Sequence, residues 1–188
     1  MKKKIIVLAL IVMAVSILAA GSAAFFTAET TAHNVITSGG VDIKLIETAK
    51  TDDGEKDFED VDGVMPSEEV SKIVKVENTG KSEAWVRIKV DVAVKSGETD
   101  GPELNTEAVT MNFDLDKWTD GGDGYYYYNS KLAAGATTEP LFTTVTFDKD
   151  MGDEYQNATF TIDVTAYAVQ TANNGETAAE AAGWPSET

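Results

Sequence analysis

The protein has 188 residues, no cysteine, and 32 acidic against 15 basic side chains, which gives a formal net charge of −17. A chain without cysteine cannot form a disulfide framework, a thiolate metal site or a cysteine-linked lipid anchor. The excess of acid predicts repulsion from nucleic acid and anionic membranes, and attraction to cations or basic partners.

Residues 1–23 have the pattern of a secretory signal peptide. A basic start is followed by an apolar run over residues 5–20 and then by small residues, which is the order that export and cleavage require. The run is shorter than the about 20 apolar residues of a spanning helix, and a retained anchor is the alternative. The small residues place cleavage between Ala23 and Ala24. We therefore expect a secreted chain, residues 24–188, that meets the signal peptidase and the membrane only before cleavage.

Beyond the signal, apolar and polar residues alternate with a period of two, which predicts strands with one buried face. The longest alternating stretches run from Ala84 to Val94 and from Ala158 to Val169. Shorter candidates lie at residues 41–46, 72–77, 109–115, 125–128 and 141–147. In the first long strand the apolar side chains should be buried and the basic ones exposed: Val86, Ile88, Val90 and Val92 against Arg87 and Lys89.

Turn signals separate these strands, among them Asn78-Thr79-Gly80 and Gly121-Gly122-Asp123-Gly124. About seven or eight short strands with such turns predict an all-β protein, folded as a jelly-roll-like antiparallel β-sandwich in a single domain. One short helix is expected near the C-terminus, over residues 176–182. Residues 50–62 are too polar for a core and are expected to form an acidic loop.

Catalytic machinery is not evident in the sequence. The only histidine is His33, in a polar stretch, whereas a zinc protease usually holds its metal with two or three histidines. A catalytic site built from carboxylates alone has no marker here. We predict that the protein is not an enzyme, that it has no catalytic residues and no metal centre, and that His33 is a solvated side chain.

Two acidic stretches raise the question of calcium, which takes several oxygen ligands. One lies within residues 50–62, and the other contains Asp114, Asp116, Asp120 and Asp123. Neither has the spacing of the twelve-residue calcium loop. The competing interpretation is a pair of solvated acidic loops, so calcium at the four aspartates is the one cofactor that the sequence leaves open.

Four consecutive tyrosines, Tyr125–Tyr128, form a candidate strand whose rings alternate between two faces. One interpretation is a contact or carbohydrate-binding surface made by Tyr126 and Tyr128 together with Trp85. The other is an ordinary strand that is half core and half amphipathic surface.

Several stretches, taken in order, resemble the TasA/camelysin family of exported Gram-positive proteins. The first is "GSAAFFTAETTAHNVITSGGVDIKLIET", with Ala24-Phe25, Asn34, Ile36, Gly39 or Gly40, Asp42, Ile43 and Leu45 in the family's pattern. The second is "VSKIVKVENTGKSEAWVRIKVDV", with Asn78, Thr79, Gly80, Ala84, Trp85, Val86 and Arg87. Late in the chain, "DGYYYYNSKLAAGATTEPLFTTVTF" and "FTIDVTAYAVQ" resemble the camelysin-like branch.

This resemblance implies a jelly-roll-type sandwich that is processed by a SipW-type signal peptidase and secreted as a monomer. Such subunits self-associate into fibres in the biofilm matrix or on the cell surface, where other matrix proteins are further partners. Some camelysin-like members are classed as metallopeptidases, but this sequence lacks a zinc motif. The competing hypotheses are a camelysin-like secreted metallopeptidase and a monomeric surface-binding or adhesion module.

Two adjacent phenylalanines, Phe25 and Phe26, follow the expected cleavage site. In a strand they point to opposite faces, so a free N-terminal segment would expose apolar surface on both sides. The segment could be buried in its own domain or could add as a strand to an open edge of the next subunit. We expect residues 24–36 to be such a donor strand, anchored by Phe25 or Phe26 with help from Val35 and Ile36.

Overall fold

The computed structural model describes residues 26–29, 34–37, 40–98 and 101–185. These residues contain two single-turn 3₁₀ helices, η1 (Thr106–Ala108) and η2 (Asp153–Tyr155), and no α-helix. The all-β class predicted from the alternation is confirmed. The strands are β1 (Phe26–Glu29), β2 (Asn34–Thr37), β3 (Ile43–Thr51), β4 (Gly54–Asp57), β5 (Val61–Val64), β6 (Glu69–Ser71), β7 (Ile73–Asn78), β8 (Ala84–Lys95), β9 (Val109–Met111), β10 (Trp118–Asp120), β11 (Tyr125–Tyr128), β12 (Thr144–Phe147) and β13 (Thr159–Gln170).

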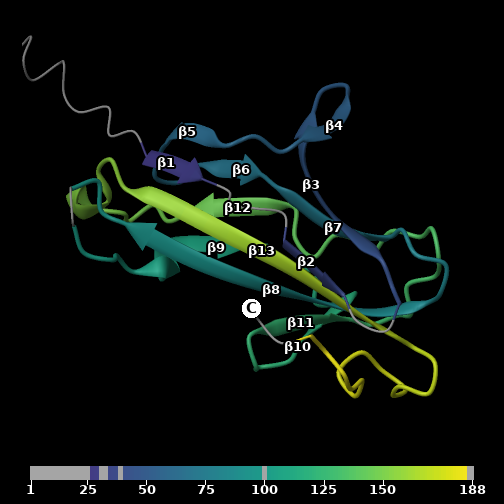
Figure 1. Cartoon of the computed structure of the whole chain (residues 1–188). Coiled ribbons are helices and arrows are strands. Elements are labelled where there is room, and N and C mark those ends of the chain that lie inside the picture. The colour runs from purple at the N-terminus through teal and green to yellow at the C-terminus, as the bar shows by residue number, and fades with distance from the viewer. Residues whose placement is uncertain (1–25, 30–33, 38–39, 99–100, 186–188) are drawn as a thin grey trace, which may run out of the picture.

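The largest sheet is built around β8 and β13 (Figure 1). These two strands pair antiparallel over their whole length, from Thr159 opposite Lys95 to Gln170 opposite Ala84. On one side, β11 pairs with β8 and β10 with β11. On the other side, β1 pairs with β13 and with β5, and β2 also pairs with β13. Both N-terminal strands run parallel to β13, whereas the other pairs in this sheet are antiparallel.

Two three-stranded sheets, β4-β3-β7 and β6-β12-β9, form the rest of the fold. The segment that leads into β12 connects them, because it hydrogen-bonds along β7. The backbone N–H of Val74 donates to the carbonyl of Phe142 at 3.1 Å, and the N–H of Leu141 donates to the carbonyl of Val74 at 2.9 Å. The two small sheets therefore act as one layer.

The main hydrophobic core lies between this layer and the large sheet. Alternate residues of β13, from Phe160 to Ala168, are buried in it together with Ile88 of β8. From the other layer, Phe147 of β12 meets Phe160 edge-on, with ring centroids 5.1 Å apart. Removal of these apolar side chains from water is the main favourable term in folding, and the two-layer packing is sandwich-like.

The helix expected over residues 176–182 is not formed; this part of the chain runs in turns and bends. Gly175 and Gly183 bracket it at φ +69° and +75°, the left-handed region that interrupts a helix. The Asn174 side chain closes the loop, because it donates to the carbonyl of Ala182 at 3.0 Å and accepts from its N–H at 2.7 Å. A two-turn helix forms too few hydrogen bonds to offset its nucleation cost.

The acidic stretch at residues 50–62 is almost entirely outside the core, as expected, but it is not only a loop. β3 continues to Thr51 and turns back as β4, so that Thr48 lies opposite Asp57. Side-chain contacts hold this hairpin to the sheet: the Thr48 hydroxyl donates to Glu55 at 2.7 Å, and Lys75 of β7 reaches the same carboxylate at 2.8 Å.

The expected register of β8 is correct on its inner face and wrong on its outer face. Val86 and Ile88 are buried and Val90 and Val92 are half-buried. Arg87, which should point into solvent, is only 9% exposed. The reason is a second, smaller cluster on the outer face of the large sheet, where the C-terminal segment covers β8, β11 and β13.

Candidate functional site

The N-terminal strands β1 and β2 lie against β13, at the border of the large sheet (Figure 1). β1 pairs with residues Thr159–Thr161 of β13, and β2 pairs with a later stretch of β13, in which Val35 lies opposite Ala166. β1 is also bonded to β5, whereas the ladder of β2 is to β13 alone. Each strand has four residues, so the backbone bonds that hold this segment are few.

A groove lies between β2 and the hairpin of β3 and β4. It has a volume of about 390 Å³ and is lined by Val35 of β2, by residues 43–47 of β3, and by Asp57 and Phe58. Val35 is 36% exposed, which is high for an apolar strand residue. The groove therefore offers apolar walls next to the short strand β2.

The residues expected at the N-terminus divide into two groups. Ala23, Ala24, Phe25 and His33 lie outside the described residues. Phe26 is the first residue of β1, opposite Val64 of β5. Val35 and Ile36 both lie in β2, where Val35 borders the groove and Ile36 is half-buried opposite Tyr167.

Three of the four aspartates proposed for calcium, Asp114, Asp120 and Asp123, stabilise local turns. Asp114 accepts from the N–H groups of residues 116 and 117, and Asp120 accepts from the N–H of Gly122 at 2.9 Å. Asp123 accepts from the N–H of Tyr125 and from the Tyr127 hydroxyl. Across the described ranges, no group of three or more acidic, histidine or cysteine side chains is placed to hold a metal ion.

The Asp123–Tyr127 contact shifts both groups. Burial opposes ionisation of Asp123, but the hydrogen bonds from the Tyr127 hydroxyl, 2.7 Å away, and from the backbone N–H of Tyr125 outweigh it and lower the pKa. Burial, and then donation to Asp123, raise the pKa of Tyr127. The carboxylate is therefore held ionised as part of the turn.

The aromatic surface suggested by Tyr126, Tyr128 and Trp85 does not form as one exposed patch. Trp85 is 2% exposed and its indole N–H donates to the carbonyl of Asn174 at 2.8 Å. Tyr128 is buried and donates to the Glu139 carboxylate, and burial followed by this bond raises the pKa of Tyr128 to about 12. Tyr126 is half-buried and stacks on Phe113, with ring centroids 4.3 Å apart. These rings are mainly packing side chains.

Arg87 lies inside a cage of aromatic rings that sequence analysis missed. Its guanidinium carbon is 3.7 Å from the ring centroid of Tyr125, 4.6 Å from that of Trp184 and 5.1 Å from that of Tyr167. Among the described atoms, its buried Nε has no hydrogen-bond partner. The signal was present in the alternation, because Trp85 and Val169 place large apolar groups on the face assigned to solvent.

A second buried cation, Lys72, is paired with Glu47 in the main core. Their side chains are 1% and 2% exposed, and Nζ lies 2.5 Å from Oε1. Nζ also lies 4.1 Å from the centre of the Phe58 ring. The pair could have been predicted from the sequence by extending the alternation of each strand. Lys72 then lies on the same face as Val74, and Glu47 lies on the same face as Leu45.

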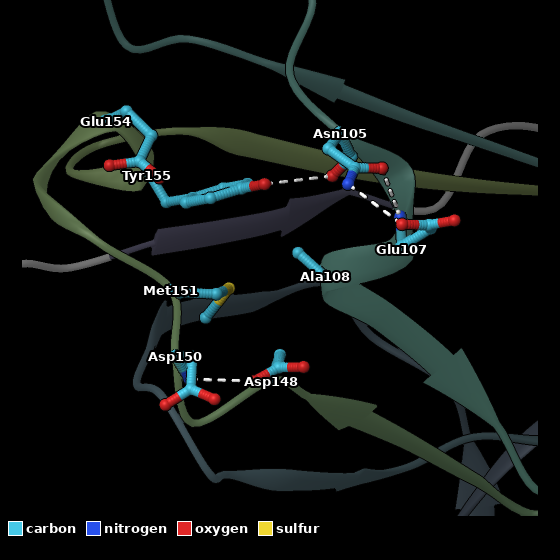
Figure 2. Close-up of a pocket in the computed structure, with 8 residues that line it drawn as sticks. All are labelled: Asn105, Glu107, Ala108, Asp148, Asp150, Met151, Glu154 and Tyr155. Carbon is cyan, nitrogen blue, oxygen red and sulfur yellow. Dashed lines mark hydrogen bonds between the residues drawn. The ribbon is translucent and has the colours of Figure 1, made fainter.

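An acidic pocket of about 220 Å³ lies where η1 and η2 approach each other (Figure 2). Four carboxylates surround it: Glu107, Asp148, Asp150 and Glu154. The Tyr155 hydroxyl donates to the carbonyl of Asn105 at 3.2 Å and so ties the two sides together. The lining contains no basic side chain and no serine, cysteine or histidine. The pocket therefore offers negative charge without a nucleophile paired to a base.

Comparison of the chain with protein-family models, with curated proteins and with solved structures finds no match. Where the structure describes the chain, it contains no helix of the length and apolar character needed to cross a bilayer.

Proposed function

We propose that the protein is a secreted structural subunit of extracellular fibres, in a biofilm matrix or on a cell surface, and that subunits join by exchange of the N-terminal strands. The observation that carries the proposal is the position of β1 and β2. They are short, parallel to β13, and paired with it on the side opposite β8, where β1 is also paired with β5. The sequence resemblance and the excess of acid are consistent with this role.

Strand exchange preserves the contacts that the segment makes within its own chain. If β1 and β2 leave, the backbone of β13 loses its partners on one side at residues 159–161 and 165–168. An exposed edge of this kind accepts a strand from another molecule, and an identical segment from a second copy fits the same register. Because donor and acceptor are different surfaces, the contact is head-to-tail and continues as an open fibre.

The groove beside β2 supplies side-chain specificity for the incoming segment. Its walls include Ile43, Leu45 and Phe58, and Val35 already borders it. An apolar side chain that enters the groove would stabilise the assembly by about 25 cal/mol for each Å² of apolar surface that it buries.

Phe25 and Phe26 are the bulky apolar groups of the donor segment, and replacing them tests the proposal. The double variant Phe25→Ser with Phe26→Ser should stay folded and monomeric and should lose fibres. A chain beginning at Gly39 should do the same.

The sharpest test locks the strand in place. The chain has no cysteine, so an engineered pair is unambiguous. Asn34→Cys with Thr165→Cys joins register partners of β2 and β13. The oxidised variant should remain monomeric in light scattering and electron microscopy, and the reduced variant should form fibres. Lys44→Cys with Glu77→Cys, register partners in β3 and β7, is the matched control and should assemble in both states. Equal assembly of the locked N-terminal variant before and after reduction would reject exchange.

Charge gives a second readout. Subunits with a net charge of −17 or more repel each other when they stack. Assembly should therefore be promoted by acid, which neutralises carboxylates, and by salt, which screens over about 10 Å at 0.1 M. Magnesium should match calcium if the divalent ion acts only by screening. Assembly that is indifferent to pH and salt would contradict this electrostatic account.

A further inference from the structure

The buried Lys72–Glu47 pair places an amine in contact with a carboxyl group inside the core. Glu47 lies on the inner face of β3, and Lys72 immediately precedes β7, the strand that pairs with β3. Nζ is 2.5 Å from Oε1. We propose that these two side chains condense in the folded protein to form an intramolecular amide bond. This proposal stands apart from fibre formation and does not depend on it.

The surroundings keep water away from both groups. Their side chains are 1% and 2% exposed, and the half-buried Phe58 ring covers Nζ. Two reacting groups held in such contact behave as if at very high concentration, with effective molarities that reach about 10⁵ M and above. The exposed Lys75–Glu55 pair has the same chemistry without this enclosure: its side chains are 22% and 40% exposed.

Condensation requires a neutral amine, and the core favours one. Burial lowers the pKa of the Lys72 amine, while the charges of Glu47, Asp60 and Asp163 act in the opposite direction without cancelling the effect. Two separated charges are expensive in a dry interior. Transfer of one proton from the ammonium to the Glu47 carboxylate converts the ion pair into an amine and a carboxylic acid, which are the reactive forms.

The reaction then balances without any other reagent. The Nζ lone pair attacks Cδ of Glu47, a C–N bond forms, and the carbonyl electrons move onto oxygen. A proton passes from nitrogen to the hydroxyl group, the C–OH bond breaks, and water leaves. The carbonyl re-forms as an amide. Overall, one ammonium and one carboxylate give one amide and one water, and a neutral amide replaces a buried ion pair.

The bond would close the chain between residues 47 and 72, around β4, β5 and β6. In a protein without cysteine, it provides the covalent brace that a disulfide provides elsewhere. It would join β3 to the start of β7, next to the groove that borders β2. A chain so closed has fewer unfolded conformations, and the folded state gains accordingly.

Mass spectrometry of the denatured full chain tests the proposal directly. The purified protein should be lighter than its sequence by one water molecule. Trypsin should not cut after Lys72, and one peptide pair should carry the junction between residues 47 and 72. Lys75 should be cut normally, because the exposed pair with Glu55 serves as an internal control. A wild-type mass equal to that of the sequence, together with normal cleavage after Lys72, would overturn the proposal.

Two variants separate the amide from other mass changes. Glu47→Gln keeps the shape and should lose ammonia in place of water, which yields the same final mass as the wild-type product. Lys72→Met removes the nucleophile and should retain the full mass of its sequence. If Lys72→Met does not fold, the Glu47→Gln mass still decides, because a Gln variant at its uncondensed mass contradicts the proposal and one lighter by ammonia supports it.

Discussion

Lys72 and Arg87 are both buried cations, and the fold treats them in different ways. Lys72 lies between the two layers, 1% exposed, and is paired with a carboxylate. Arg87 lies on the opposite face of the large sheet, 9% exposed, and is surrounded by the rings of Tyr125, Tyr167 and Trp184. Among the residues that the structure describes, no carboxylate forms an ion pair with Arg87, although the whole chain carries 32 acidic side chains.

The difference follows from the two ions and from depth. An ammonium is compact and strongly hydrated, and in a dry core it needs an opposite charge or must lose its proton. A guanidinium is planar and weakly hydrated, so ring faces can replace much of its water. Only one chain segment, the C-terminal stretch that includes Trp184, separates the cage from solvent. A charge can thus be buried by pairing or by stacking, according to how far it lies from solvent.

The largest effect should come from breaking the pair in the core. Glu47→Ala removes the carboxyl partner of the buried Lys72 amine. Loss of one member of a buried ion pair costs about 3–5 kcal/mol of unfolding free energy, and loss of the proposed amide would add the stability that its cross-link contributes. Urea denaturation measures it. The matched control is Glu55→Ala, which breaks the exposed contact with Lys75 and should cost under about 1 kcal/mol. Equal losses for the two variants would mean that Glu47 and Lys72 are solvated.

Removal of Arg87 should cost less than this, but more than an exposed arginine would. Arg87→Ala loses cation–π contacts worth about 0.5–2 kcal/mol each and the packing of its stem, so we expect a loss of about 2–3 kcal/mol. Arg87→Lys should recover only part of it, because an ammonium cannot stack. Ile88→Ala, on the opposite face of the same strand, provides the scale for a cavity, about 2–5 kcal/mol. A loss of unfolding free energy near zero for Arg87→Ala would mean that Arg87 faces solvent, as the sequence predicted.

The sequence predicted the part of this fold that depends on alternation. The spans of β8 and β13 and their core-facing residues could be located because period two reports directly which side of a strand is buried. The assignment of the other side failed at Arg87, since what covers that side is a distant segment, residues 171–185, that alternation does not see. The strand expected over residues 109–115 ends at Met111 because the Asn112 side chain accepts from the N–H groups of residues 143 and 144 and replaces the ladder. The N-terminal candidate could be placed as a strand, but its partner, β13, could not.

The contribution of Trp184, the cage ring that comes from the C-terminal segment, should be separable from that of the two tyrosine rings. Trp184 is half-buried, with its ring centroid 6.1 Å from that of Tyr127 and 4.6 Å from the Arg87 guanidinium carbon. Trp184→Ala should cost about 1–2 kcal/mol, from one lost cation–π contact and part of one ring. Fluorescence of the remaining tryptophans during urea unfolding measures this. In the Arg87→Ala background the same change should cost less, because the two residues act on one contact, and a fully additive loss would contradict the cage.

The smallest effect should be found at Asp123, which accepts from the hydroxyl of Tyr127, the ring that packs against Trp184 of the cage. The folded protein holds the pKa of Asp123 below its usual value. A carboxyl group with a lowered pKa contributes stability that is present above the pKa of the unfolded chain and is lost as the pH falls through the folded value. Asp123→Asn should therefore lower the melting temperature slightly at neutral pH. The difference from the wild type should shrink on acidification and vanish once the carboxyl group is protonated in both the folded and the unfolded state.

Glu139→Gln is the comparison, because the Glu139 carboxylate accepts from the Tyr128 hydroxyl and this bond lowers the pKa of Glu139. The melting-temperature difference between Glu139→Gln and the wild type should also shrink as the pH falls, although Tyr128 belongs to the main core. A melting difference at Asp123 that grows in acid would mean that the carboxylate does not stabilise the turn.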